Sequence, residues 1–297
     1  MDFLGRAASF VRVVEAGSMS AAARSLGLSL AAMSRQMTTL EGELGASLLE
    51  RTTRHQRLTE EGRRFLAHAT ALVREADAAR ASVRTSKAIS GDFTLSASVS
   101  LGLLRIIPAL PRLASAHPAL RLDLRLEERT VELVGDGVDL AVRAGLALPD
   151  TSHVIAQRLA TFPRRIVAAP RYLRANGTPR TVAALASHPM ITGPAAPARM
   201  ELDGESIALD IHYRIGTLVG IRDAAIAGLG IAVLPDFVTA EAIEAGSLKP
   251  ILASSTVAPV QAHALYRIEA RGNPRIDAVL AHLRDTLPSR KRERRLE

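Results

Sequence analysis

Five residues within eight consecutive positions form a small, polar helix face that could contact nucleic acid. They lie in the stretch SLAAMSRQM: Ser29, Ala32, Ser34, Arg35 and Gln36. Serine and glutamine side chains can hydrogen-bond base edges or phosphates, and arginine suits guanine or phosphate. Ser34 or Gln36 could instead only cap or solvate the helix, so the elements that position this face decide between the two interpretations.

Two helices separated by a tight turn are expected to carry this face. A first helix, with Phe10 on its apolar side, should stop at Gly17, and a short helix over 21–26 follows it. After a turn, Ser29 can cap a third helix that ends at Gly45. The apolar face of that third helix repeats at spacings of four, three and four residues: Met33, Met37, Leu40 and Leu44. This is the helix-turn-helix plan, although many helical hairpins resemble it.

A basic hairpin should follow the third helix. The stretch SLLERTTRHQRLTEEG is expected to form a short strand, a turn and a returning strand. It carries four basic or titratable side chains: Arg51, Arg54, His55 and Arg57. Such a wing can contact the DNA backbone or the minor groove. The alternative is a solvated hairpin that binds nothing.

A long helix is expected after the hairpin, with Thr59 as its cap. Extended to Lys87, it would be about 43 Å long at ~1.5 Å per residue. Apolar residues recur along it in heptads: Phe65, Ala69, Leu72, Ala76, Ala79 and Val83. Because the first 90 residues offer no other core-sized element, this pattern favours pairing with a second copy over packing on its own domain.

Strands and helices alternate after the long helix, which predicts mostly parallel sheets covered by helices. The first strand alternates apolar and polar residues over 93–100, and a helix from Leu103 to about His117 follows. The apolar face expected for that helix consists of Leu103, Ile107, Leu110 and Leu113. A short helix is expected near 130–134. About 200 residues suit two lobes with a cleft between them.

Four polar residues are the best candidates for binding a ligand at the carboxyl ends of these strands. They follow or end strands, three of them next to a helix start: Ser98, Ser100, Arg143 and Thr217. Two helix N-termini and an arginine favour an anion, so a small organic acid is expected, with aromatic acids among the candidates. The alternatives are helix capping for the serines and a structural ion pair for Arg143. Phe162 and Ile191 could add an apolar wall or belong to the core.

The distribution of charge limits the class of partner. The chain of 297 residues has a net charge of +8, with 13 Lys and Arg against 9 Asp and Glu in residues 1–87. The last ten residues hold 5 basic and 2 acidic residues, and the stretch between is nearly neutral. A basic end can steer the protein toward nucleic acid. A solvated tail is the favoured alternative for the C-terminus.

Several classes of site lack their sequence signatures. The chain has no cysteine, which excludes disulfides and thiolate chemistry, and its eight histidines show no metal-ligand spacing. Dinucleotide-binding, nucleophile-elbow and zinc-protease motifs are absent, so neither an enzyme nor a cofactor is expected. No uncharged apolar run of about 18 residues and no secretory leader is seen, which indicates a cytoplasmic protein with no membrane partner.

Three N-terminal segments, in order and at matching spacing, resemble the LysR-type transcriptional regulators: SMSAAARSLGLS, SRQMTTLEGELG and LLERTTRHQRLTEEG. The segments PRLASAHPALRLDLRL, LVGDGVDLAVRAG and AAIAGLGIAVLPDF are similar to the effector-binding region of the CrgA-like subgroup. The resemblance covers almost the whole chain. It departs at Leu30 and Ala31, where the family commonly has Pro or Gln followed by Ser or Ala, so it does not imply which base sequence is read.

The resemblance implies an N-terminal all-α winged helix-turn-helix domain, a long linker helix, and an α/β region of two subdomains similar to periplasmic binding proteins. The expected bounds are 1–58 for the DNA-binding domain, 59–90 for the dimerisation helix and hinge, and 91–297 for the effector-binding domain. Within the last, subdomain I is expected over about 91–162 and 267–290, and subdomain II over about 163–266.

The resemblance also implies a function: sequence-specific transcriptional regulation modulated by a small-molecule effector. It places Ala32, Ser34, Arg35 and Gln36 near DNA, Arg51, Thr53 and Arg54 in the wing, and the effector near the serine, arginine and threonine positions named above. Promoter or operator DNA, a second copy in a dimer, a tetramer of two dimers and RNA polymerase are the expected partners. An exported solute-binding protein would need a signal peptide, and an architectural DNA protein would not need a large neutral domain.

Overall fold

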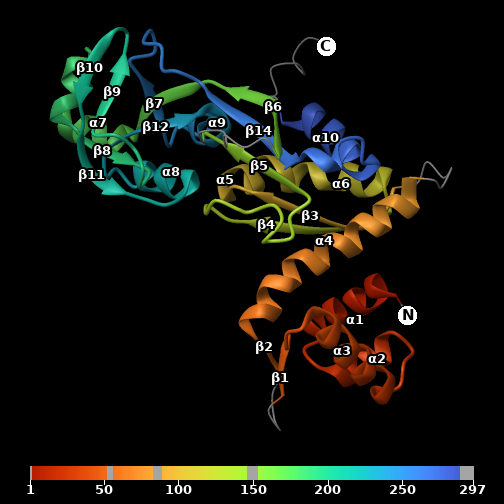
Figure 1. Ribbon diagram of the computed structural model, residues 1–297. Coiled ribbons are helices and arrows are strands. Elements are labelled where there is room, and N and C mark those ends of the chain that lie inside the picture. The colour runs from red at the N-terminus through yellow and green to blue at the C-terminus, as the bar shows by residue number, and fades with distance from the viewer. Residues whose placement is uncertain (1, 52–55, 83–88, 146–152, 288–297) are drawn as a thin grey trace. The chain divides into compact units, whose positions relative to one another are not determined.

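The structure, a computed structural model, describes residues 2–51, 56–82, 89–145 and 153–287 (Figure 1). It divides into two compact units. The first comprises residues 1–88 together with 131–139, and the second comprises 89–130 together with 140–297. The heptad position Val83 and the basic C-terminal tail lie outside the described residues.

The first unit contains three short helices, a two-stranded hairpin and a long helix. Their bounds are Phe3–Glu15 (α1), Met19–Ser25 (α2), Leu30–Leu44 (α3), Leu49–Arg51 (β1), Gln56–Leu58 (β2) and Glu60–Ser82 (α4). Ser18 and Ser29 cap α2 and α3, because each hydroxyl oxygen accepts from the backbone N–H three residues ahead. Gly45 ends α3 in the left-handed conformation, with φ of 66°. The helix-turn-helix plan and the hairpin are therefore confirmed.

Helix α4 begins by packing on its own unit rather than on a second copy. Its Phe65 ring lies 5.5 Å from the ring of Phe10, centroid to centroid, and Ala69 is fully buried in the same core. The pairing predicted for Ala69 is therefore wrong, because the core of this unit already buries it, whereas Phe65 is only half-buried and its pairing stays a prediction. Further along the helix, Leu72 is 44% exposed. Pairing through this later part of α4 stays a prediction.

The second unit contains two five-stranded sheets. The first has the order β4-β3-β5-β14-β6, and the second has the order β11-β8-β12-β7-β13. The strands of the first sheet are Ser90–Ala97 (β3), Ala119–Leu126 (β4), Leu140–Ala144 (β5), Val154–Phe162 (β6) and Val260–Arg267 (β14). Those of the second are Arg164–Ala168 (β7), Pro189–Thr192 (β8), Asp210–Arg214 (β11), Ile231–Pro235 (β12) and Lys249–Ile251 (β13). A separate hairpin joins Arg199–Leu202 (β9) to Glu205–Ala208 (β10).

Each sheet has four strands that run in one direction and one that runs against them, so the prediction of mostly parallel sheets is confirmed. In the first sheet β3 runs parallel to β4 and β5, but β14 runs antiparallel to β5 and β6. In the second sheet β7 runs antiparallel to both β12 and β13. The opposed strands, β7 and β14, each come directly after a place where the chain passes from one sheet to the other without a helix.

The chain crosses from the first sheet to the second at Pro163, between the ends of β6 and β7, as predicted. It returns between Ile251 and Val260. The predicted return near 266–267 is therefore wrong, because the whole of β14 belongs to the first sheet. One hydrophobic core nevertheless runs through both sheets, and Phe162 of β6 packs against Phe237, with ring centroids 4.6 Å apart.

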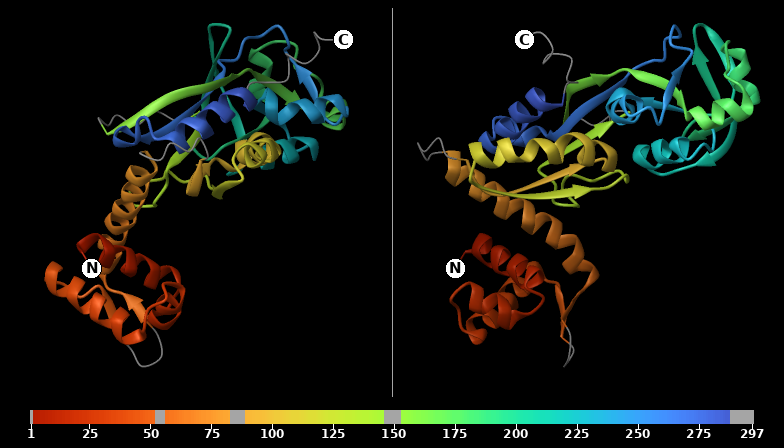
Figure 2. Two further views of the ribbon diagram at one scale, coloured as in Figure 1. Left: turned by 90° about the vertical axis from the view of Figure 1, so that its right-hand side faces the viewer. Right: turned by 180° about the vertical axis from the view of Figure 1, so that it is seen from behind.

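Helices cover the sheets of the second unit. They are Val99–Leu101 (α5), Gly102–Ile106 (η1, a π-helix), Ile107–Ala116 (α6), Pro170–Asn176 (α7), Ala183–Ser187 (η2, a 3₁₀ turn), Leu218–Ile226 (α8), Asp236–Glu244 (α9), Ile268–Ala270 (η3, a 3₁₀ turn) and Pro274–Thr286 (α10). Helices α6 and α10 lie side by side (Figures 1 and 2), and the ring Nε2 of His282 lies 3.0 Å from the Ala109 carbonyl oxygen. Burial lowers the pKa of this histidine. The helix predicted near 130–134 is absent, because 133–137 forms turns.

The π-helical turn explains why half of the predicted apolar face of the helix after β3 is wrong, whereas Leu110 and Leu113 contact the core as predicted. Leu103 and Ile107 are 44% and 41% exposed, whereas Leu101 and Ile106 are fully buried. A π turn adds one residue to the helical repeat, so the buried face shifts in phase. Within the described residues, Val99–Ala116 has the length and mean hydropathy, 1.3, of a membrane span, but its buried side chains belong to the core between the sheets.

The strand β3 is buried on both faces. Thr94 and Ser96 are only 3% and 0% exposed, like the apolar residues with which they alternate. The strand lies between β4 and β5, which pair with its two edges. A buried hydroxyl needs a hydrogen-bond partner, and Ser96 has two, as described below.

We expect Gly62→Ala to destabilise the first unit, by about 1–3 kcal/mol. A Cβ atom on Gly62 would collide with the backbone carbonyl oxygen of Leu48, which cannot move aside as a flexible side chain could. The matched control is Gly42→Ala in α3, where no heavy atom lies within 4 Å of the added carbon. That control should gain up to about 1 kcal/mol from the helix propensity of alanine. Thermal unfolding monitored by circular dichroism measures both, and equal melting temperatures would contradict the expectation.

Candidate functional site

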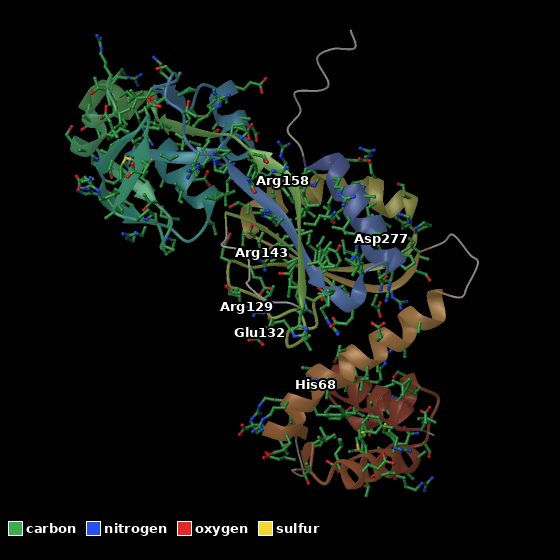
Figure 3. The ribbon with its side chains drawn as sticks, turned by 45° about the horizontal axis from the view of Figure 1, so that its top comes forward. His68, Arg129, Glu132, Arg143, Arg158 and Asp277 are labelled. Atoms are coloured by element: carbon green, nitrogen blue, oxygen red, sulfur yellow. The ribbon has the colours of Figure 1, made fainter. Side chains whose placement is uncertain are left out.

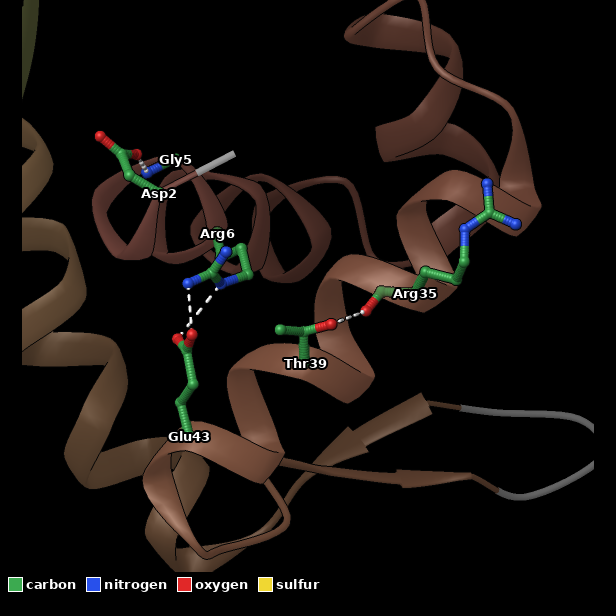
Figure 4. Close-up of polar contacts among 6 residues, drawn as sticks. All are labelled: Asp2, Gly5, Arg6, Arg35, Thr39 and Glu43. Carbon is green, nitrogen blue, oxygen red and sulfur yellow. Dashed lines mark hydrogen bonds and ion pairs between the residues drawn. The ribbon is translucent and has the colours of Figure 1, made fainter.

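The outer face of α3 presents a ridge of exposed residues, Ala31, Arg35 and Thr38, at helical spacing. Figure 4 shows the Arg35 side chain extending away from the contact between α3 and α1. Its carbonyl oxygen accepts a hydrogen bond from the Thr39 hydroxyl at 2.9 Å. The sequence patterns did not include Ala31 and Thr38 in this face, and it is their exposure in the structure that places them there.

The other residues predicted for this face differ in their burial and in their hydrogen bonds. Ser34 and Ala32 are half-buried beside the ridge. In the described residues Ser34 makes no hydrogen bond that would hold it, whereas Ser29 is engaged as the helix cap at 3.1 Å from the Ala32 nitrogen. Gln36 is turned toward α1, where its Oε1 accepts a hydrogen bond from the hydroxyl of the buried Ser9. The face is therefore built from Ala31, Arg35 and Thr38 at its centre, with the predicted residues at its margin.

Carboxylates of α3 fix this helix to its neighbours. The Glu41 Oε1 accepts from the backbone nitrogens of Leu48 and Leu49, at 2.8 and 3.2 Å, and so ties α3 to the start of the hairpin. Glu43 forms an ion pair with Arg6 of α1 (Figure 4). Sequence patterns did not reveal either contact, because the partners lie 7 to 37 residues apart.

The hairpin is anchored at its base. The Thr59 hydroxyl donates to the Ser47 carbonyl oxygen at 2.6 Å and accepts from the Gly62 nitrogen at 2.9 Å, which also caps α4 as predicted. Arg51 is the last residue of β1. The structure describes its place in the strand but not its side chain. Thr53 and Arg54, predicted at the tip of the wing, lie outside the described residues.

A second group of polar side chains surrounds Arg143, near the end of β5 (Figure 3). The residue is 4% exposed, and burial lowers the pKa of its guanidinium, although this group remains a cation. The Nη2 atom donates to the Ser96 hydroxyl at 2.7 Å, and this hydroxyl donates to Glu127 at 3.0 Å. The Nε atom has no hydrogen-bond partner among the described residues. Arg143 is thus a buried cation whose Nε donor is unused, and it hydrogen-bonds the Val142 carbonyl oxygen and the Ser96 hydroxyl rather than a carboxylate.

The helix starts near Arg143 are already capped by the chain itself. The Val99 nitrogen at the start of α5 donates to the Glu128 carboxylate at 3.1 Å, and the Ser98 side chain makes no capping bond. At the start of α8, the Val219 nitrogen donates to the Ser100 hydroxyl at 3.1 Å. Ser100 therefore joins the helix after the first sheet to a helix of the second sheet, instead of capping its own helix.

Thr217 caps α8, with its hydroxyl oxygen 3.1 Å from the Gly220 nitrogen. Two further polar atoms lie after parallel strands of the same sheet: the Thr192 hydroxyl at the end of β8 and the Asp236 Oδ1 after β12. Both are buried without a hydrogen-bond partner among the described residues. Sequence reasoning missed these two residues, although the strand-end rule that selected Thr217 also applies to them.

Two predicted wall residues belong to the core. Phe162 and Ile191 are 0% and 1% exposed and pack in the cluster that runs through both sheets. Among the described residues no cluster of three or more histidine, aspartate or glutamate side chains could bind a metal ion.

Two families match almost the whole chain. Residues 4–63 match the bacterial regulatory helix-turn-helix proteins of the lysR family, and residues 86–288 match the LysR substrate binding domain. The HTH-type transcriptional regulator CrgA of Neisseria meningitidis serogroup C is 33% identical over 253 residues, which cover 83% of this chain and 84% of that protein. An uncharacterized HTH-type regulator of Haemophilus influenzae is 30% identical over 273 residues, covering 90% and 94%.

Solved structures agree with the sequence comparison. The structure of CrgA, a LysR-type regulator from Neisseria meningitidis, superposes with a TM-score of 0.61 at 29% identity and covers 95% of this chain and 97% of that one. The virulence activator AphB of Vibrio cholerae gives a TM-score of 0.60 at 24% identity, covering 95% and 98%. The latter likeness is evidence for the fold.

We expect Glu41→Ala to loosen the hairpin and to lower the stability of the first unit by about 1–3 kcal/mol, because two backbone N–H groups lose their acceptor. Glu43→Ala, on the same helix, removes a more exposed ion pair and should cost about 1 kcal/mol or less. Hydrogen exchange at the Leu48 and Leu49 amides distinguishes the two: it should accelerate in the first variant alone. Unchanged exchange in Glu41→Ala would show that the carboxylate does not hold the hairpin.

Proposed function

Because the chain belongs to the LysR family of DNA-binding transcriptional regulators, we propose that a small organic acid, bound between its two α/β subdomains, modulates its DNA binding or activation. The observation that carries the proposal is the buried Arg143, whose Nε donor is unused. A buried guanidinium favours an anionic partner, and a carboxylate matches its planar geometry. The protein would act in the cytoplasm, where its DNA lies, and the proposal requires no cofactor.

The first unit supplies the DNA contacts in this proposal. The exposed Arg35 and its neighbours Ser34 and Ala32 would enter the major groove, with Ser29 at the start of the helix close to the backbone. Arg51, Thr53 and Arg54 of the wing would contact phosphates or the minor groove. Two copies in a dimer, and two dimers in a tetramer, would engage successive half-sites, and RNA polymerase is the expected partner in activation.

The bound acid would compete with the chain's own carboxylates. Glu128 now accepts from the Val99 nitrogen, and Glu127 is linked to Arg143 through Ser96. An incoming carboxylate would take the Nε donor of Arg143 and replace Glu128 at the helix start. The Ser100 hydroxyl accepts a hydrogen bond from the Val219 nitrogen, so a rearrangement at α5 would also move the start of α8. The ligand would then shift the population between two arrangements of the subdomains, provided that it binds one of them more tightly.

We expect Arg35→Ala to weaken binding to the DNA upstream of the protein's own gene about tenfold, and to lower the slope of log affinity against log salt concentration by about one if Arg35 contacts a phosphate. Fluorescence anisotropy at several salt concentrations, with scrambled competitor DNA, measures both. The control is Arg12→Ala on α1, whose guanidinium pairs with Glu15 at 3.0 Å. Equal affinities of the wild-type protein and Arg35→Ala would remove Arg35 from the interface.

We expect calorimetry with a panel of small aliphatic and aromatic acids to find a ligand that Arg143→Met binds at least tenfold more weakly, because the variant lacks the buried cation. Glu128→Gln should bind the same acid more tightly, since the amide no longer repels it. Arg158→Met, an exposed arginine of the same sheet, is the matched control and should bind like the wild-type protein. If no acid gives heat, or if Arg143→Met binds normally, the effector is not an anion held at Arg143.

A further inference from the structure

The register of the first sheet places a histidine directly beside Arg143. On β14, His263 pairs with Arg143 of β5 on one side and with Arg158 of β6 on the other. Residues that lie directly opposite each other in an antiparallel pair share a face of the sheet, with Cβ atoms about 4.5–5.5 Å apart. The three side chains therefore form a row across one face of the sheet, in which Arg143 is buried, His263 is half-buried and Arg158 is exposed.

Arg143 uses two of its nitrogens toward β3 and its own strand. The Nη2 atom donates to the Ser96 hydroxyl of β3 at 2.7 Å, and Nη1 donates to the Val142 carbonyl oxygen at 3.1 Å. The Nε atom is buried and has no hydrogen-bond partner among the described residues. Because β5 lies between β3 and β14, Ser96 and His263 stand on opposite sides of Arg143. An anion held at Nε would find its second donor at His263, since the β3 side is already occupied.

We propose that His263 is the second binding residue of the Arg143 anion site, and that its imidazole takes up one proton when the acid binds. The inference rests on the proposed function, to which it adds a ligand contact and a dependence on pH. A neutral imidazole has one N–H donor, whereas the imidazolium donates from both ring nitrogens and carries a charge. Its hydrogen bond to a carboxylate is then charge-assisted, and such bonds are shorter and roughly twice as strong as neutral ones. The proton comes from the solvent.

Without an anion, the surroundings of His263 disfavour its charged form. Burial lowers the pKa of its imidazole, and the charge of Arg158 lowers that pKa further. The second effect is the smaller one, because Arg158 is exposed and its charge is screened by salt. The neighbours of His263 on the same face of β14, Gln261 and Leu265, carry no charge. A carboxylate beside the ring would oppose both effects and raise the pKa of His263.

The carboxylates that the chain itself brings to Arg143 lie on its other side. Glu127 and Glu128 follow β4, which β3 and β5 separate from β14. Together with Arg129, they act on the charge of Arg143. A ligand at the Nε atom would instead place its negative charge next to His263. The ligand, rather than the chain's own acids, would therefore control the protonation of this histidine.

Binding of the acid should strengthen as the pH falls. Between the lower pKa of His263 in the free protein and its higher pKa in the complex, each bound acid takes up a proton, and the affinity rises up to about tenfold for each unit by which the pH falls. Above this window the ring is neutral in both states, and below it the ring is charged in both, so the affinity levels off at each end. Such a regulator would respond more strongly to an acid when acidification accompanies it.

The experiment is calorimetry of the full-length protein with benzoate and acetate as probes. Each probe carries a single carboxylate, which stays ionised above about pH 5.5. Titrations at this and several higher pH values give the affinity, and titrations in two buffers of different ionisation enthalpy give the number of protons taken up. Wild type, His263→Gln and Arg143→Met are compared. His212→Gln is the matched control, because His212 is an exposed histidine of the second sheet, 3.3 Å from Asp210.

The wild type and His212→Gln should take up about one proton per acid in the middle of the pH range and should lose affinity as the pH rises. His263→Gln should take up no proton, and its affinity should stay flat, near the value that the wild type reaches at high pH. The pKa of the assigned His263 imidazole, followed by NMR in the wild type, should rise when benzoate is added. This measurement keeps the test decisive if His263→Gln fails to fold.

A wild-type protein that binds a probe without proton uptake, or whose affinity does not change with pH, would overturn the proposal. Proton uptake that persists in a folded His263→Gln protein would also refute it, because another group would then carry the proton. Failure of the proposed function looks different: neither probe would bind the wild type at any pH, or Arg143→Met would bind both probes as the wild type does.

Discussion

The burial of Arg143 is the constraint on which the polar contacts at the end of the first sheet depend. A cation enclosed to this extent is costly unless its donors are satisfied or a negative charge lies near it. Strand β3, next to β5, supplies the Ser96 hydroxyl, and the segment after β4 supplies Glu127, which compensates the charge through that hydroxyl. The next residue, Glu128, caps the helix that follows β3. Two consecutive acids thus neutralise a cation and a helix end at the same edge of one sheet.

The sequence allowed the helix ends of the first unit to be predicted because capping is decided within three or four residues. Ser29 and Gly45 bracket α3 as expected, and Thr59 caps α4. Periodic patterns were less reliable, since a pattern shows that a face is buried without showing what buries it. Ala69 continues a heptad repeat, yet the core of its own unit buries it. The π turn after β3 shifted the first part of an apolar face, so that Leu101 and Ile106 are buried in place of Leu103 and Ile107, which no count of spacings foresees.

For a similar reason, the sequence indicated where the candidate sites lie but not which contacts their residues make. Strand ends followed by helix starts pointed to Ser100, Arg143 and Thr217, and these residues do hold polar positions there. Their partners could not be predicted, because Ser100 meets a backbone nitrogen 119 residues away and Ser96 meets Arg143 across 47 residues. On α3, composition identified the face, but the hydrogen bond that turns Gln36 toward Ser9 depends on how α1 crosses α3.

The strand order of the first sheet has a consequence for synthesis on the ribosome. β14 lies between β5 and β6, but it is translated about a hundred residues after β6, a delay of roughly 5–20 s. Until then β5 and β6 have no shared neighbour, and their unpaired edges are exposed to other nascent chains. The second sheet comes from one continuous stretch, from β7 to β13, and can close first. The first sheet therefore stays incomplete through most of translation. A truncated chain that ends before β14 would keep these unpaired strand edges, and it would aggregate rather than act as a smaller regulator.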